Sequence, residues 1–98
     1  MPKYLITYQG GTGMDPSQMD AVKAAFAGWL STAGGAVTDP GSPTMPVAHV
    51  TSGQKVETEV GGYTMMEAPS KDAVVDLLKQ HPFVATGGTL QVNEVLPM

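Results

Sequence analysis

The stretch GYTMMEAPSKDAVVDLLKQHP, residues 62–82, contains a complete strand-to-helix unit. Its first seven residues, 62–68, include aromatic and β-branched side chains, and this composition predicts a strand. Ser70 then stands where an N-cap residue accepts hydrogen bonds from the free amides of a first helical turn. We expect the helix to run to Gln80, because Pro82 has no amide hydrogen and ends the pattern. The residues that would face inward are Val74, Leu77 and Leu78.

The same order of elements occurs earlier in the chain. Lys3–Gln9, KYLITYQ, predicts a first strand, and a helix is expected from Pro16 to Ala33. The apolar residues of that helix recur at three- and four-residue spacing and form one stripe: Met19, Val22, Phe26, Trp29, Leu30 and Ala33. A short strand at Ala36–Thr38 is expected to end in the turn Asp39–Ser42, and a last strand is expected at Thr89–Leu96.

Three connecting segments are less regular. Gly10–Gly13 follows a strand as a phosphate-binding loop does, but it lacks the lysine and the glycine spacing of such loops, so we interpret it as a plain loop. Asp15–Gln18 carries the start signals of the first helix. Two weak extended segments, Val47–Thr51 and Lys55–Glu59, are expected to pair as an edge hairpin.

The order of elements predicts one α+β domain over residues 1–98, with the ferredoxin-like βαββαβ plan and an antiparallel sheet. Both helices would then cover one face of the sheet. The other face would also be apolar, because it carries Leu5 and one of the adjacent residues Met65 and Met66. A large exposed apolar face is rare in monomers, so we expect a homodimer that packs sheet against sheet.

Composition excludes several classes of partner and chemistry. The net charge is −4, and the five basic residues are scattered lysines, so no surface for nucleic acid is predicted. The chain has no cysteine, which rules out disulfides and thiolate sites. It has neither an apolar run near 18 residues nor a signal-peptide stretch, so no membrane association is expected and the predicted location is cytoplasmic.

The candidates for acid–base chemistry are few. His49 and His81 are the side chains that ordinarily titrate near neutral pH. His81 ends the second predicted helix, where the helix dipole favours an imidazolium, and this structural role is the preferred interpretation over a catalytic one. Asp39 opens a turn and is expected to accept an amide hydrogen bond there; alternatively it orients a histidine. The two histidines lack metal-ligand spacing, so neither a metal nor a cofactor is predicted.

Aromatic side chains are the candidates for binding a small molecule. Tyr8, Trp29 and Tyr63 are expected either to line a small cavity between the sheet and the helices or simply to pack in the core.

Four segments cover most of the chain: KYLITYQG, FAGWLSTAGGAVTDPGSP, VGGYTMMEAPSKDAVVDLLKQHPF and GGTLQVNEV. In these segments the chain resembles the YCII-related, or DGPF, family of small bacterial proteins. The resemblance implies a ferredoxin-like dimeric α/β barrel, in a family mostly of unknown function with a few members that look like lyases or dehydrohalogenases using a His–Asp pair. By this resemblance His81 and Asp39 would be catalytic. The enzyme-like members place a histidine in the first helix, whereas Pro16 to Ala33 contains none here.

Three functional hypotheses follow. The first is a dimeric domain that performs acid–base, lyase-like chemistry on a small organic molecule. The second is a non-enzymatic module that binds a small ligand or a protein through the same cleft. The third is a monooxygenase of similar barrel shape that handles heme or quinones.

Overall fold

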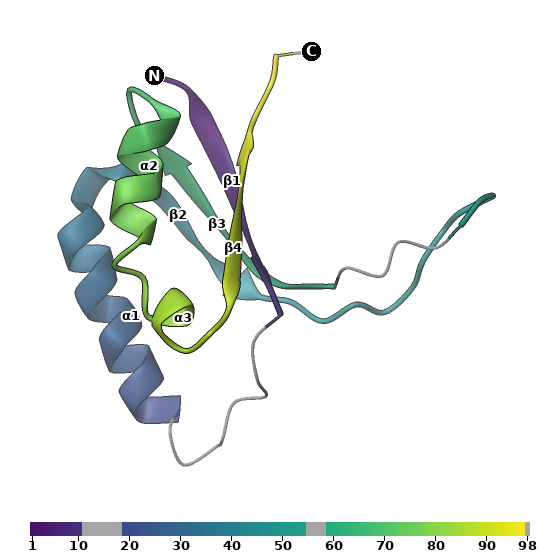
Figure 1. Ribbon diagram of the computed structural model, residues 1–98, viewed down its shortest axis with the longest axis horizontal. Helices are drawn as coiled ribbons and strands as arrows, with labels where there is room; N and C mark the ends of the chain where they lie inside the picture. The colour runs from purple at the N-terminus through teal and green to yellow at the C-terminus, as the bar shows by residue number, and fades with distance from the viewer. Residues whose placement is uncertain (11–18, 55–58, 98) are drawn as a thin grey trace.

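The computed structural model describes residues 1–10, 19–54 and 59–97, which form one layer of sheet covered on one face by helices (Figure 1). The elements in chain order are β1 (Lys3–Gln9), α1 (Met19–Ala33), the 3₁₀ turn η2 (Gly34–Ala36), β2 (Val37–Pro43), β3 (Val60–Glu67), α2 (Lys71–Leu78), α3 (Pro82–Ala85) and β4 (Thr89–Glu94). None of the helices in the described ranges is long and apolar enough to cross a membrane.

The sheet is antiparallel with the strand order β2-β3-β1-β4. The first strand therefore lies inside the sheet and pairs with both β3 and β4, which come from the second half of the chain. The helices lie together on one side of the sheet (Figure 1). This arrangement confirms the predicted ferredoxin-like α+β fold.

Helix α2 begins as the sequence predicts but differs from the prediction at its end. Ser70 is the N-cap of α2, where its hydroxyl accepts a hydrogen bond from the Ala73 amide at 3.3 Å. The helix ends at Leu78 instead of Gln80, and Pro82 begins the short helix α3. A proline is well suited to a first helical position, because the amide hydrogen that it lacks would have no partner there.

The strand β2 differs from its prediction. It was expected to end in a turn at Asp39–Ser42, but it continues to Pro43 as an edge strand with irregular register against β3. Gly41 has a φ of 77°, and a Cβ atom there would lie 1.7 Å from the Tyr63 carbonyl oxygen. Only glycine allows the backbone to approach β3 so closely, so the segment is accommodated as a bulge.

Beyond β2 the chain leaves the sheet as an extended segment, residues 44–54, here called the arm (Figure 1). Residues 47–51 are described and do not form the expected hairpin strand. Most of the expected partner strand, residues 55–58, lies outside the described residues. Residues 11–18, which contain most of the glycine loop and the helix-start signals, also lie outside them. The arm side chains are exposed, with exposed fractions of 78% for Met45, 87% for Val47 and 101% for Val50.

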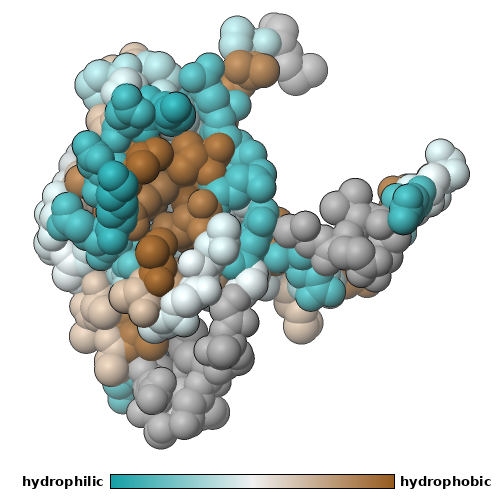
Figure 2. Space-filling model, viewed as in Figure 1, coloured by the Kyte–Doolittle hydropathy of each residue, from teal (hydrophilic) through white to brown (hydrophobic). Residues whose placement is uncertain are grey.

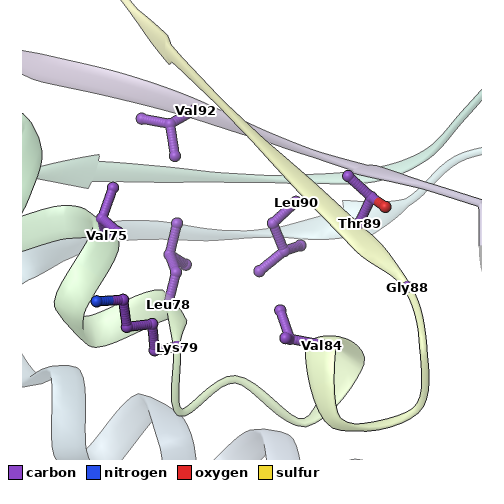
Figure 3. A pocket seen from close by; sticks show the side chains of 8 residues that line it. All are labelled: Val75, Leu78, Lys79, Val84, Gly88, Thr89, Leu90 and Val92. Carbon is purple, nitrogen blue, oxygen red and sulfur yellow. The ribbon is translucent and has the colours of Figure 1, made fainter.

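An apolar hollow is visible on the surface between α2 and β4 (Figure 2). This feature, here called the α2–β4 groove, is open to solvent and has a volume of about 300 Å³. Valine and leucine side chains from α2, α3 and β4 point into it (Figure 3). Its lining residues are Val75, Leu78, Lys79, Val84, Gly88, Thr89, Leu90 and Val92.

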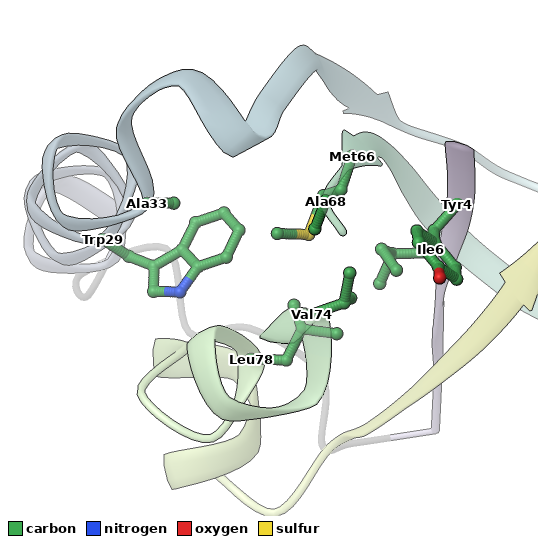
Figure 4. Close-up of a cluster of buried hydrophobic side chains, with 8 residues drawn as sticks. All are labelled: Tyr4, Ile6, Trp29, Ala33, Met66, Ala68, Val74 and Leu78. Atoms are coloured by element: carbon green, nitrogen blue, oxygen red, sulfur yellow. The ribbon is translucent and has the colours of Figure 1, made fainter. Parts of the chain in front are cut away.

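The hydrophobic core lies between the helices and the sheet (Figure 4). It consists of Tyr4, Ile6, Trp29, Ala33, Met66, Ala68, Val74 and Leu78. Trp29 is 3% exposed, and its indole nitrogen donates a hydrogen bond to the Leu77 carbonyl at 2.8 Å, which fastens α1 to α2. Of the apolar stripe predicted for the first helix, Trp29 and Ala33 belong to this core and Phe26 and Leu30 pack against it.

The face of the sheet away from the helices is mixed instead of uniformly apolar. Leu5, Tyr63 and Met65 are half-buried there, in alternation with the core positions of their strands. Beside them runs a row of hydrogen-bonded polar side chains from β1 and β4, namely Thr7, Gln9, Gln91 and Asn93.

Candidate functional site

His81 is a buried polar side chain with hydrogen-bond partners on both ring nitrogens. It stands between α2 and α3 and is 2% exposed. Its Nδ1 atom accepts a hydrogen bond from the Phe83 amide at 3.0 Å, so the imidazole is the N-cap of α3. A short loop between two helices thus holds the ring in place at the level of the core.

The other ring nitrogen begins a chain of hydrogen bonds that crosses the sheet. The His81 Nε2 atom lies 2.9 Å from the Tyr8 hydroxyl, which lies 2.7 Å from the Thr64 hydroxyl. The Thr64 hydroxyl in turn donates to the Pro40 carbonyl at 2.9 Å. These hydrogen bonds therefore join the loop between α2 and α3 to β1, β3 and the bulge of β2.

The two ends of this chain determine the position of every proton in it. An amide can only donate, so Nδ1 carries no proton and the neutral His81 ring carries its proton on Nε2. A carbonyl can only accept, so Thr64 gives its proton to Pro40. Tyr8 must therefore accept from His81 and donate to Thr64, and all the hydrogen bonds point in one direction.

Aromatic rings surround the imidazole and remove it from water. Ring centroids lie 4.5 Å away for Trp29, 5.6 Å for Phe26 and 5.2 Å for Tyr8, and the Phe83 ring lies 5.2 Å from that of Tyr8. Burial lowers the pKa of His81 to about 4. Burial also raises the pKa of Tyr8, partly offset by the hydrogen bond with Thr64. At neutral pH the site thus holds a neutral imidazole and a protonated phenol.

The interpretation of His81 as a helix-terminal cation is therefore wrong. The residue does follow α2, but its ring is buried among aromatic side chains and caps the start of the next helix. Both surroundings disfavour a positive charge, because burial penalises ions and a helix N-terminus repels cations.

Asp39 lies apart from the imidazole. Its carboxylate accepts a hydrogen bond from the Gly41 amide at 2.9 Å, as expected for a turn-like segment, and it is exposed. The register pairs Asp39 with Met65, on the face away from the helices. No hydrogen bond joins Asp39 to His81 in the described part of the chain, where both ring nitrogens have other partners.

The three predicted aromatic residues are also divided between the two faces. Tyr8 and Trp29 both contact His81 on the helix side. Tyr63 precedes Thr64 in β3 and therefore points to the opposite face, since neighbouring strand residues alternate. Sequence reasoning missed Thr64 and Phe83, although strand alternation alone places Thr64 on the core face with Met66.

The described residues contain no group of three or more histidine or carboxylate side chains that could hold a metal ion. The arrangement is instead an uncharged hydrogen-bond relay inside an aromatic shell. When the Tyr8 hydroxyl rotates away from Thr64, it can donate its one proton or a hydrogen bond to a ligand, and the Nε2–H group can stabilise negative charge on the phenol oxygen.

Comparison with known proteins supports the fold. No known family profile matches the chain, and no curated protein matches it either. Among solved structures, it resembles the 5-chloro-2-hydroxyhydroquinone dehydrochlorinase TftG from Burkholderia phenoliruptrix AC1100 in complex with 2,5-dihydroxybenzoquinone. The match has a TM-score of 0.53 and 22% identity and covers 91% of this chain and 90% of the other. The chain has a ferredoxin-like fold. Similarity at this level of identity extends to the fold alone.

Proposed function

We propose that this protein is an enzyme that performs acid–base, lyase-like chemistry on a small organic molecule, with the Tyr8 hydroxyl as its proton donor. The observation that supports the proposal is the one-directional hydrogen-bond chain from His81 through Tyr8 to Thr64. A structural tyrosine needs one partner, whereas this hydroxyl is held between a fixed donor and a fixed acceptor.

Tyr8 suits direct contact with a ligand better than His81 does. Tyr8 is half-buried, whereas His81 is 2% exposed and both of its nitrogens are occupied. When Tyr8 gives its proton to a substrate oxygen or a departing group, the Nε2–H of His81 stabilises the phenolate that remains. In this role His81 is a positioning residue, and its neutral form is the useful one.

The aromatic rings that adjoin Tyr8 favour a planar ligand. The rings of Phe83 and His81 lie against the Tyr8 ring, and flat rings stack favourably on such surfaces. The solved relative contains a dihydroxybenzoquinone and is named for a chlorinated hydroxyhydroquinone, so phenols, quinones and their halogenated forms are the first compounds to test.

The alternative is a binding module without catalysis. The same hydroxyl and rings would hold a small ligand, and the low pKa of His81 favours this function in one respect. A side chain that stays neutral above about pH 4 offers a constant hydrogen-bond pattern over the physiological range.

We also propose that two copies pair through the outer faces of their sheets, as dimeric α/β barrels do and as the YCII-related resemblance implies. Leu5, Tyr63 and Met65 supply the apolar part of that face, and the row of polar side chains from β1 and β4 supplies hydrogen bonds. Sedimentation that gives a monomer at tens of micromolar protein would contradict the pairing.

The catalytic proposal is tested with Tyr8→Phe. The matched control is Tyr63→Phe, which removes a tyrosine hydroxyl from the opposite face of the sheet. Each variant is assayed on the phenol and quinone panel, with melting temperatures measured in parallel. Tyr8→Phe is expected to lower kcat by about 10²–10⁴, the usual contribution of a general acid, whereas Tyr63→Phe retains parent activity. Asp39→Asn in the same assay tests the predicted role of that carboxylate.

Equal turnover by the parent and Tyr8→Phe would refute the proton-donor role. If no compound is turned over but one binds, and Tyr8→Phe weakens its Kd while Tyr63→Phe does not, the binding module takes the place of the enzyme.

A further inference from the structure

We propose that the arm of each chain packs into the α2–β4 groove of a second copy, so that the two subunits hold each other reciprocally. The inference rests on the homodimer proposed above. It adds a second contact between the two copies, made by the arm of one and the α2–β4 groove of the other. It does not depend on what reaction, if any, Tyr8 supports.

The arm carries three large apolar side chains that are exposed to solvent. Met45, Val47 and Val50 are 78%, 87% and 101% exposed. The last hydrogen bonds that tie the arm to its own sheet are made by Thr44, from its amide to Gly61 and from its hydroxyl to Val60. A cluster of exposed aliphatic side chains on an extended segment marks an interaction site, because water contact of this extent is unfavourable.

The α2–β4 groove has the matching chemistry. Aliphatic side chains of α2, α3 and β4 point into it (Figure 3). The charged group at its rim, Lys79, lies 3.5 Å from the Asp76 carboxylate on the same helix. The groove therefore offers few polar partners to a metabolite, and its volume of about 300 Å³ suits valine or methionine side chains.

The topology places the arm and the groove of one chain at opposite edges of the sheet. In the order β2-β3-β1-β4 the arm leaves from the β2 and β3 side, whereas the groove borders β4 at the other edge. The arm also extends away from the helices (Figure 1). If two sheets pack face to face about a two-fold axis along the strands, each β2 edge lies near the partner's β4 edge, and each arm reaches the partner's groove.

The size and charge of the contact are adequate for a stable pair. Each subunit would contribute the arm, residues 44–54, and the eight groove residues, close to the roughly 20 residues a side of a standard interface. No lysine or carboxylate lies in residues 44–54, so burial of the arm desolvates no permanent charge. Two such contacts also shield the open edge of β4.

Cross-linking gives a direct test, because the natural chain has no cysteine. Full-length Val47→Cys, carrying a mass tag, is mixed with untagged Val84→Cys, allowed to exchange subunits and mildly oxidised. The control mixture replaces Val84→Cys with Ala24→Cys, an exposed position on α1. We expect a disulfide-linked heterodimer of the tagged and untagged chains in the first mixture, at least tenfold above the control by intact mass spectrometry.

Sedimentation equilibrium of Val47→Ser gives the second measurement. Each buried valine side chain is worth about tenfold in affinity, and a symmetric dimer loses two, so the dimer Kd is expected to rise about 100-fold. If the parent is a dimer, but cross-linking equals the control and Val47→Ser leaves Kd unchanged, the arm proposal fails and the sheet-to-sheet dimer stands. A monomeric parent overturns both, whatever the Tyr8 assay gives.

Discussion

The neutral state of His81 makes the stability of the protein depend on pH in a defined window. Burial lowers the pKa of His81 from 6.5 to about 4. Between these values the unfolded chain binds a proton on this ring and the folded chain does not, so stability rises with pH. The contribution of His81 is complete above about pH 6.5 and is lost as the pH falls towards 4.

The expected size of this loss follows from the difference between the two pKa values. It corresponds to at most about 3 kcal/mol of unfolding free energy, and to roughly 2 kcal/mol after allowance for solvent screening around a site that Tyr8 leaves partly open. The physical cause is specific: a second proton must go to Nδ1, which faces the Phe83 amide at 3.0 Å. Protonation therefore removes the cap of α3 and buries a charge.

Urea unfolding of the parent and of His81→Asn at about pH 7 and about pH 4 measures the effect. Trp29 is the sole tryptophan and is buried beside His81, so its fluorescence reports unfolding. Asparagine keeps the ability to cap a helix, and the carboxylates shared by both proteins cancel in the comparison. We expect the stability advantage of the parent over His81→Asn to shrink by roughly 2 kcal/mol at the lower pH. An advantage that is the same at both pH values would refute the reasoning.

Two further predictions concern packing and backbone. Trp29→Ala is expected to lower the free energy of unfolding by about 3–5 kcal/mol, as large core aromatics do, and denaturant midpoints equal to the parent would show that Trp29 is not a core residue. Gly41→Ala is expected to disrupt β2, because its Cβ atom would lie 1.7 Å from the Tyr63 carbonyl oxygen, whereas Gly10→Ala, also at positive φ, meets no atom within 4 Å. Comparison of their melting temperatures separates close approach from the φ penalty alone, and equal losses would contradict the role given to the bulge.

The periodic elements could be predicted because local signals determine them. The apolar stripe of α1 and the Ser70 cap of α2 are visible in neighbouring residues. The extension of β2 was not predicted, since it depends on a strand some twenty residues later that accepts a bulge at Gly41. The four-residue helix α3 is too short to leave a periodic signal.

The candidate site could be predicted only in part. Tyr8 and His81 were each singled out, but they stand 73 residues apart, and no spacing rule brings them together. The lowered pKa of His81 follows from burial among rings contributed by α1 and by β1, so it depends on the tertiary fold. The catalytic role predicted for Asp39 and His81 stays a prediction, and the described hydrogen bonds give each residue partners other than the other one.

The position of β1 inside the sheet has a consequence for synthesis of the chain. During synthesis β1 must wait for β3 and then for β4, which ends at Glu94, before both of its edges are paired. All residues from β1 to β4 must therefore be made before the sheet closes, and the non-local pairing favours slow folding. Until then the apolar residues Tyr4 and Ile6 are open to other nascent chains, so expression of truncated forms that end before β4 is expected to yield aggregates.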